Sequence, residues 1–334
     1  MKRRVCLSVV FYLLIMMIAV SCKKTQNNRE QTNGELVICA LRKDGFLEAT
    51  VPLFEEKFGV KCVVREAEAV DEKWLEECDV IVGVTEDFIY DCREALLPYV
   101  SVNDKYLIER YRNTEGYSTA YMLDGSCLIA NSSLVEKSEL KGYRDLLKPR
   151  FQGQIAVGNP ITSASAFSHL TSLLTAMGGA ESDEAWEFIS KLHLQVGETV
   201  SDSVKMYDDV AAGRMMVGLA SEAPAISMID SGADFFLVYP EEGTSYQAVR
   251  ACVLKKSANP EYAKHFMDFI SGREMQKIYA EKLLKRVVYN GITGSEHLLP
   301  TDRIPVNIED IEYIKQNKMK IIQKYSDYAG MSDN

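Results

Sequence analysis

The chain has 334 residues, of which 47% are hydrophobic and 26% are charged, and its formal net charge at pH 7 is −10. This length favours two lobes over a single core, and the composition is that of an ordinary globular protein. The acidic balance excludes nucleic acid as an expected partner, because phosphate backbones are repelled. Any anionic ligand must therefore be held by local donors.

The start of the chain has the pattern of an export signal. A basic tetrapeptide precedes an apolar run that is too short for the ~20 apolar residues that cross a bilayer, so residues 1–21 are predicted to be a signal peptide. Residues 19–22 (Ala-Val-Ser-Cys) are similar to the lipobox of bacterial lipoproteins, although leucine is more usual than Ala19. We expect a lipid on Cys22, a flexible tether over 22–34 and a periplasmic or cell-surface location. The alternative is a soluble exported protein with an incidental cysteine.

Six cysteines follow Cys22, and four of them stand in apolar, strand-like runs that we interpret as buried free thiols. An even count in an exported protein also allows disulfides, for which Cys78–Cys92 is a candidate pair. No Cys-x-x-Cys pair occurs, and the four histidines have no metal-ligand spacing. We therefore expect neither a metal nor a cofactor. The six cysteines are Cys39, Cys62, Cys78, Cys92, Cys127 and Cys252.

The first part of the exported chain alternates strands with helices, which is typical of a parallel α/β sheet. Helices are predicted over 46–58, where Asp44 is a cap, and over 72–78. Strands are predicted at 35–40, 61–66, 79–84, 117–123 and 126–130.

A second unit begins near residue 131. Its helices are predicted at 143–147, 163–177, 183–192 and 204–212. Its strands are predicted at 154–159, 215–220 and 235–239. A strand over 246–255 then returns the chain to the first lobe, and two helices follow, over 260–281 and 308–328. The resulting division is 35–130 for lobe 1, 131–240 for lobe 2, and 241–334 for the return to lobe 1 with the C-terminal helices.

Catalytic and nucleotide-binding motifs are absent from the sequence. No G-x-G-x-x-G, Walker A, H-E-x-x-H or G-x-S-x-G occurs. Residues 138–141 match S-x-x-K and residues 332–334 match S-D-N, but no K-T-G exists, so we interpret both as chance matches. Carboxylates are plentiful without a spacing that suggests paired-acid catalysis. The prediction is a protein that is not an enzyme, with an exported hydrolase as the remaining enzymatic hypothesis.

Three strand-to-helix turns in the second unit end in small polar residues, and these turns are candidate ligand sites. In open α/β sheets, ligands bind beyond the carboxyl ends of strands, where helix N-termini present free N–H groups and favour anions. The other use of such residues is as N-caps without a ligand. The candidates are Thr162, Ser163, Ser165, Ser201, Ser203, Ser221 and Glu222.

Each candidate has an expected role. The serines and Thr162 would hold an anionic head group, whereas Glu222 would accept from a hydroxyl or ammonium group of the ligand. Arg42 follows the first strand and would pair with the anion from lobe 1. Tyr246 would supply a hydroxyl or an aromatic wall, although a tyrosine in the core is equally consistent with its position.

Two segments resemble the periplasmic ferric-iron, aminoethylphosphonate and sugar-phosphate binding proteins of ABC importers. Residues 153–167 (Gly-Gln-Ile-Ala-Val-Gly-Asn-Pro-Ile-Thr-Ser-Ala-Ser-Ala-Phe) are similar to the family's G-K-I-A-x-x-x-P strand and its Ser/Thr-rich helix start. Residues 242–271 are similar to its E-G-T-x-Y…N-P-E-x-A-K…F-L-S block, and residues 36–60 to its opening strand and helix. The likeness extends over most of residues 35–325.

The resemblance implies an α/β fold of the type II periplasmic-binding-protein kind. It has two lobes, each a mostly parallel sheet flanked by helices, with a hinge and an interlobe cleft. The protein would catalyse nothing and would deliver its solute to a membrane permease with a cytoplasmic ATPase. We expect a monomer whose other partners are a small anionic solute and the membrane, through a lipidated Cys22.

The sequence departs from the ferric-iron members in a way that bears on the ligand. Those members carry adjacent tyrosines after the strand that matches residues 215–220, whereas this chain has Ser-Glu-Ala-Pro at 221–224 and no Tyr-Tyr pair. Ferric iron prefers phenolate and carboxylate oxygens. Residues 65–70 also replace a Gly/Ser-rich helix start. The prediction is therefore a phosphorylated or phosphonate solute. A ferric iron or iron-chelate importer and a ligand sensor for a membrane histidine kinase remain alternatives.

Overall fold

The computed structural model describes residues 34–67 and 72–329, except for the side chains of Glu72, Asp87 and Ser203. The predicted signal peptide, Cys22 and all but the last residue of the predicted tether lie outside the described residues. Within the described ranges, no helix has both the length and the apolar character that crossing a membrane requires. The described residues from Glu35 onward form one compact unit.

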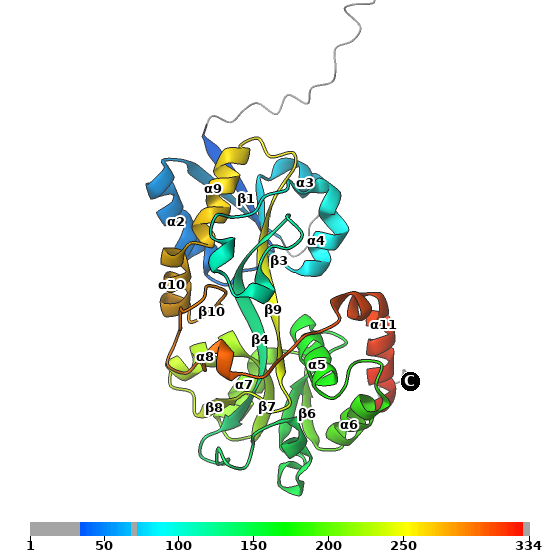
Figure 1. Ribbon diagram of the computed structural model, residues 1–334. Helices are drawn as coiled ribbons and strands as arrows, with labels where there is room; N and C mark the ends of the chain where they lie inside the picture. Colours follow the sequence, from blue (N-terminus) through cyan, green and yellow to red (C-terminus); the bar gives the residue numbers. More distant parts are fainter. Residues whose placement is uncertain (1–33, 68–71, 330–334) are drawn as a thin grey trace, which may run out of the picture. The chain divides into compact units, whose positions relative to one another are not determined.

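Lobe 1 is built on a mixed sheet with the strand order β2-β1-β3-β9-β4 and with β10 on the far side of β4 (Figure 1). Three parallel strands form one side of it: β1 (Glu35–Ala40), β2 (Lys61–Glu66) and β3 (Val80–Val84). The others are antiparallel to their neighbours: β4 (Thr119–Asn131), β9 (Thr244–Val253) and β10 (Arg286–Val287).

Two groups of helices cover the two faces of this sheet. The buried residues of the first group pack with Leu36, Ile38 and Val82, and those of the second group pack with Cys39 and Ile81. The first group is α2 (Phe46–Phe58), α9 (Pro260–Ile270) and α10 (Arg273–Lys282). The second group is α3 (Glu72–Glu77) and α4 (Glu86–Cys92).

Lobe 2 has the strand order β4-β7-β5-β6, with β8 also paired to β4. Its strands besides β4 are β5 (Ile155–Gly158), β6 (Val196–Val200), β7 (Val217–Ser221) and β8 (Phe235–Val238). One face packs against α5 (Ala164–Ala176), α6 (Asp183–His193) and α11 (Ile311–Tyr328). The other face packs against α7 (Ser203–Ala211) and α8 (Glu222–Asp230).

Strand β4 belongs to both sheets. Residues 119–125 pair with β9 in lobe 1, and residues 126–131 pair with β7 and β8 in lobe 2. The sequence predicts two strands here, but the structure has one continuous strand of 13 residues. Glycine is required at position 125, because a Cβ atom there would lie 2.1 Å from the ring of Tyr246. The close approach of β4 and β9 at this point is what joins the two lobes.

Other differences from the predicted elements have local causes. The long helix predicted over 260–281 is two helices, because the helical conformation is interrupted at Ser271-Gly272. The Ser271 hydroxyl donates to the Met267 carbonyl at 2.8 Å, and Gly272 is the N-cap of α10. Helix α11 starts at residue 311, where the side chain of Asp310 accepts from the Tyr313 N–H at 2.9 Å. The sequence pattern missed the short strands β6, β10 and β11 (Val306–Asn307).

The cysteines are only partly as expected. Cys39 on β1 and Cys78 just before β3 form a disulfide, with their Cα atoms 6.1 Å apart. The suggested Cys78–Cys92 pair is therefore wrong, because β1 and β3 are adjacent strands and bring Cys39 next to Cys78 instead. Among the described residues Cys127 and Cys252 are buried free thiols, as interpreted from their apolar runs, and Cys62 and Cys92 are half-buried free thiols.

Candidate functional site

The carboxyl ends of three parallel strands, β5, β6 and β7, meet at one edge of the lobe 2 sheet. Gly158 is the register partner of Val200, and the N–H of Asn159 donates to the Val200 carbonyl at 2.9 Å. The loops that follow β5 and β6 therefore run side by side. Thr162, Ser163 and Ser201 lie in these loops, so the fold brings these two groups of predicted site residues to the same edge.

Helix α5 presents its N-terminus at this edge. The hydroxyl of Ser163 accepts from the Ala166 N–H at 3.3 Å, so Ser163 is the N-cap, and its oxygen lies 3.0 Å from the hydroxyl oxygen of Ser165. Thr162 and Ser165 are exposed. Gly158 allows the helix to start this close to β5, because a Cβ there would lie 2.7 Å from that of Ala166. The positive end of a 13-residue helix favours an anion here.

The turn before α7 is capped differently from the turn before α5. The carboxylate of Asp202 accepts from the Val204 N–H at 2.9 Å and is the N-cap, whereas Ser201 is exposed beside it. Residue 203 begins the helix, and its side chain is outside the described part of the chain. The loop after β6 thus brings one hydroxyl and one negative charge to the edge.

Ser221 ends β7 and contacts α5. Its hydroxyl lies 3.0 Å from Nε2 of His169, and its N–H donates to the Tyr207 hydroxyl at 2.9 Å. Burial lowers the pKa of His169 to about 4, so the imidazole is neutral at pH 7. The sequence reading did not select His169, because a single histidine within a helix has no spacing that marks a site.

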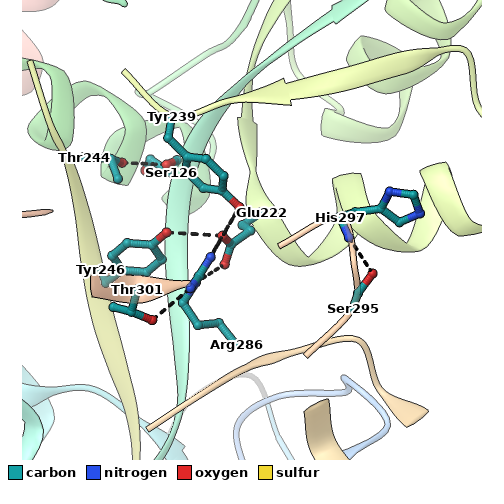
Figure 2. A network of polar contacts seen from close by, with 9 residues as sticks. All are labelled: Ser126, Glu222, Tyr239, Thr244, Tyr246, Arg286, Ser295, His297 and Thr301. Atoms are coloured by element: carbon teal, nitrogen blue, oxygen red, sulfur yellow. Dashed lines mark hydrogen bonds and ion pairs between the residues drawn. The ribbon is translucent and has the colours of Figure 1, made fainter. Parts of the chain in front are cut away.

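Glu222 is buried, with 2% exposure, and its carboxylate is bound by groups of the chain itself (Figure 2). Oε1 lies 2.6 Å from Nη2 of Arg286, and Oε2 lies 2.9 Å from Nε of the same residue. The hydroxyls of Tyr239 and Tyr246 donate to Oε1 at 2.5 and 3.2 Å. The structure thus places arginine and tyrosine donors where we expected the hydroxyl or ammonium group of a ligand.

This cluster joins the two lobes. Glu222 begins α8 in lobe 2, Arg286 lies on β10 in lobe 1, and Tyr246 lies on β9 opposite Gly125 of the shared strand β4. Burial alone would lower the pKa of Arg286, but the hydrogen bonds and charge of Glu222 outweigh it and raise that pKa. Arg286 also donates to the Thr301 hydroxyl at 2.9 Å. The only signal for Arg286 in the sequence is a charge beside the apolar pair Val287-Val288.

Arg42, the candidate from lobe 1, reaches the shared strand β4. Its side chain passes over Gly83 and forms an ion pair with Asp124, and its Nε lies 3.9 Å from a carboxylate oxygen of Asp44. Asp124 is two residues from Ser126, the register partner of Ser221. Arg42 therefore lies near the end of β7, with its charge balanced by two carboxylates.

The described residues contain no group of three His, Cys, Asp or Glu side chains able to hold a metal ion. Tyr239 and Tyr246 both donate to Glu222 at the start of α8. Burial first, and the charge of Glu222 second, raise the pKa of each of these tyrosines. The site therefore disfavours the phenolate form that a ferric ion prefers.

Comparison with known proteins agrees with this architecture. An uncharacterized protein of Haemophilus influenzae is 27% identical over 292 residues, which cover 82% of each chain. The fructose-6-phosphate-bound periplasmic binding protein AfuA of Actinobacillus pleuropneumoniae has a TM-score of 0.70 at 21% identity, covering 90% of this chain and 100% of that one. The apo ferric ion-binding protein A of Pasteurella haemolytica has a TM-score of 0.73 at 17% identity, covering 88% of this chain and 98% of that one.

These two structures confirm the predicted two-lobed periplasmic-binding-protein fold. Residues 79–296, more than half of the chain, match the family described as bacterial extracellular solute-binding protein. Members of this family act outside the cytoplasm and bind solutes without chemically converting them. The chain belongs to the family of bacterial extracellular solute-binding proteins.

Proposed function

We propose that this chain is the solute-binding subunit of an ABC importer and that it captures a small phosphorylated or phosphonate solute. The observation that carries the proposal is the N-terminus of α5, where the hydroxyls of Ser163 and Ser165 lie at the positive end of a helix, with exposed Thr162 just before them and Ser201 on the neighbouring loop. Hydroxyl and N–H donors at a helix N-terminus can bind a phosphoryl group even in a protein whose net charge is negative. The fructose-6-phosphate bound by AfuA supports this class of ligand.

The remaining candidates keep the roles expected from the sequence. Thr162, Ser163, Ser165 and Ser201 hold the anionic head, and Ser221 lies at the same edge. Ser203, whose side chain lies outside the described residues, is assigned to the same head group from its place in the sequence alone. Arg42 approaches from lobe 1 and exchanges part of its contact with Asp124 for the ligand. Glu222 and Tyr246 act from within the buried cluster, where they fix the relation of α8 to β9. A lipid on Cys22 holds the protein at the membrane beside the permease, to which the loaded protein delivers its solute.

Ferric iron or an iron chelate is the second candidate cargo, supported by the likeness to the ferric ion-binding protein of Pasteurella haemolytica. The raised pKa values of Tyr239 and Tyr246 and their hydrogen bonds to Glu222 weigh against it. A phosphorylated solute needs no phenolate. It is therefore the cargo that we favour.

The proposal is tested by a thermal-shift panel on residues 24–334, which lack the cysteine proposed to carry the lipid. The panel contains sugar phosphates, phosphoglycerates, aminoethylphosphonate, inorganic phosphate and ferric citrate, each near millimolar. A ligand of micromolar affinity at a thousandfold excess adds about 4 kcal/mol of stability, which raises the melting temperature by several degrees. A shift with a phosphorylated or phosphonate compound supports the proposal. A shift with ferric citrate alone contradicts it.

The position of the anion is tested by Ser163→Asp. Aspartate is also a good N-cap, so the helix is retained, but its charge repels a phosphoryl group and binding should be lost in calorimetry. Ser182→Asp is the matched control, because Ser182 caps α6 by the same 3.3 Å hydrogen bond. Undiminished affinity in Ser163→Asp would show that the anion lies elsewhere.

A further inference from the structure

We infer that helix α11 is an electrostatic latch between the lobes, which acts through an ion pair of Lys315 with Asp91 on α4. By its packing α11 belongs to lobe 2, whereas α4 belongs to lobe 1. The latch would bias the protein toward the form in which the lobes are close together, before any solute binds. The inference is therefore independent of which solute the protein carries.

The C-terminal half of α11 is anchored in lobe 2. Ile321 and Tyr325 are buried in the core cluster that also contains residues of α5 and α6. Nearby, the ammonium group of Lys324 lies 4.9 Å from the centre of the Trp186 ring on α6. Because of these contacts, α11 must move with lobe 2.

Helix α4 is attached to lobe 1 in the same manner. It follows β3 directly in the chain, and its buried residue Ile89 packs with Cys39 on β1 and Ile81 on β3. The next two residues, Tyr90 and Asp91, are exposed: Tyr90 retains 72% of its surface and the side chain of Asp91 retains 58%. The helix thus buries one side chain against its own sheet and leaves the following two available for contact.

These two exposed residues are the ones that contact α11. Helix α4 and the start of α11 lie side by side (Figure 1). Lys315 forms an ion pair with Asp91, and its ammonium nitrogen lies 5.1 Å from the centre of the Tyr90 ring. The last turn of α4 has no basic residue of its own, so Lys315 brings a positive charge to the negative end of that helix. Ion pair, aromatic ring and helix dipole all favour the cation at this place.

The contact lies at the edge of the space between the lobes. A cavity of about 420 Å³ is lined there by both lobes, with Glu86 of α4 and Lys315 of α11 among its walls. Tyr90 and Asp91, in contrast, do not line it. Since α4 and α11 move with different lobes, separation of the lobes must break the contact between Lys315 and Asp91.

The strength of the latch follows from its exposure. The side chains of Lys315 and Asp91 are 32% and 58% exposed, so water and salt screen their attraction. A pair of this kind changes the ratio of closed to open molecules by about fivefold at most. Such a bias keeps the closed form accessible and still allows the lobes to separate and release a solute.

The test measures the radius of gyration of residues 24–334 by small-angle X-ray scattering, without added solute. Asp91→Lys and Lys315→Asp each place like charges at the contact, so each should open the lobes and increase the radius of gyration. The double variant Asp91→Lys/Lys315→Asp restores the pair with its charges exchanged, and its radius should return to that of the unchanged protein. Lys320→Asp is the matched control, because it makes the same charge change at an exposed position of α11 and should leave the radius as it is.

Two results would overturn the inference. One is an unchanged radius of gyration in both single variants, which would mean that the contact does not bias the lobes. The other is a double variant that is at least as expanded as the single variants, because the effect would then not arise from the pair. Melting curves distinguish opening from unfolding. If a charge reversal unfolds the protein, Asp91→Asn replaces it, and the smaller expansion expected from this variant should disappear in about 1 M sodium chloride, where the pair is screened in both proteins.

Discussion

Glu222 and Arg286 form a buried ion pair between the two lobes, although 64 residues separate them in the sequence. Two charges removed from water are costly unless they are paired and their remaining hydrogen-bonding capacity is satisfied. Both conditions hold here, because Tyr239, Tyr246 and Thr301 complete the contacts (Figure 2). The cluster lies beside the point where β4 passes from one sheet to the other, so it fixes the geometry of the junction.

Breaking this pair on one side should be strongly destabilising. Glu222→Gln keeps the size of the side chain but leaves the Arg286 charge buried without a counter-charge, and the free energy of unfolding should fall by about 3–5 kcal/mol. Urea denaturation followed by circular dichroism measures the change. The double variant Glu222→Leu with Arg286→Met, which removes both charges, should lose less than the single variant.

An exposed pair provides the control. Glu187 and Lys191 on α6 lie 2.6 Å apart at the surface, and Glu187→Gln should cost far less than Glu222→Gln, because water screens such pairs. A loss in Glu222→Gln as small as that in Glu187→Gln would show that the interlobe pair does not stabilise the fold.

Adding a single methyl group at the junction of the two lobes should lower the free energy of unfolding of the protein. In Gly125→Ala the new Cβ would lie 2.1 Å from the ring of Tyr246, so the ring or the strand must move, at a cost of about 1–3 kcal/mol. Tyr246→Leu removes the ring, and in a double-mutant cycle it should recover part of the loss caused by Gly125→Ala. Simple additivity of the two changes would mean that the ring and the glycine are not in contact.

Reduction of the Cys39–Cys78 disulfide should lower the stability of the folded protein. Cys39 and Cys78 are 39 residues apart, and closing a loop of this length stabilises by about 4 kcal/mol. Dithiothreitol should lower the melting temperature of the unchanged protein and leave that of the Cys39→Ala/Cys78→Ala variant unaltered. Cys252→Ala, which replaces a buried free thiol, keeps the response to reductant. Peptide mapping that links Cys78 to Cys92 would contradict the structure.

Acid should destabilise the fold through His169. Its folded-state pKa of about 4 is below the ordinary value of 6.5, so the unfolded chain binds the proton more readily. Its contribution is fully present above about pH 6.5 and is lost as the pH falls through 4, a change of about 3 kcal/mol.

The variant His169→Gln should flatten the dependence of unfolding free energy on pH between 6.5 and 4. His297→Gln serves as the control, because His297 is exposed and should leave the curve as it is. Chemical denaturation at a series of pH values gives both curves. An unchanged slope in His169→Gln would mean that the histidine titrates normally in the folded protein.

The sequence by itself determined most of the helices and strands, and the edge of the lobe 2 sheet at which the loops with small polar residues meet. Hydrophobic periodicity predicted most helices and strands, since burial of one face is a local pattern, and the small polar residues at 162–165 and 201–203 identified the helix starts. Two missed features were also local in origin: Ser271-Gly272 interrupts a helix that looks continuous by periodicity, and β4 has a continuous extended run where two strands were expected.

Only the tertiary structure decided which polar groups pair with one another. In the sequence Glu222 stands at a helix start, and no residue near it in the chain indicates that Arg286 and Tyr239 will donate hydrogen bonds to its carboxylate. Cys39 pairs with Cys78 because β1 and β3 are neighbouring strands in the sheet. The spacing of the cysteines along the chain does not show that these strands are neighbours. The physical reason is the same in both cases: a local pattern reports burial and backbone conformation, whereas the partner of a buried charge or thiol is set by long-range packing.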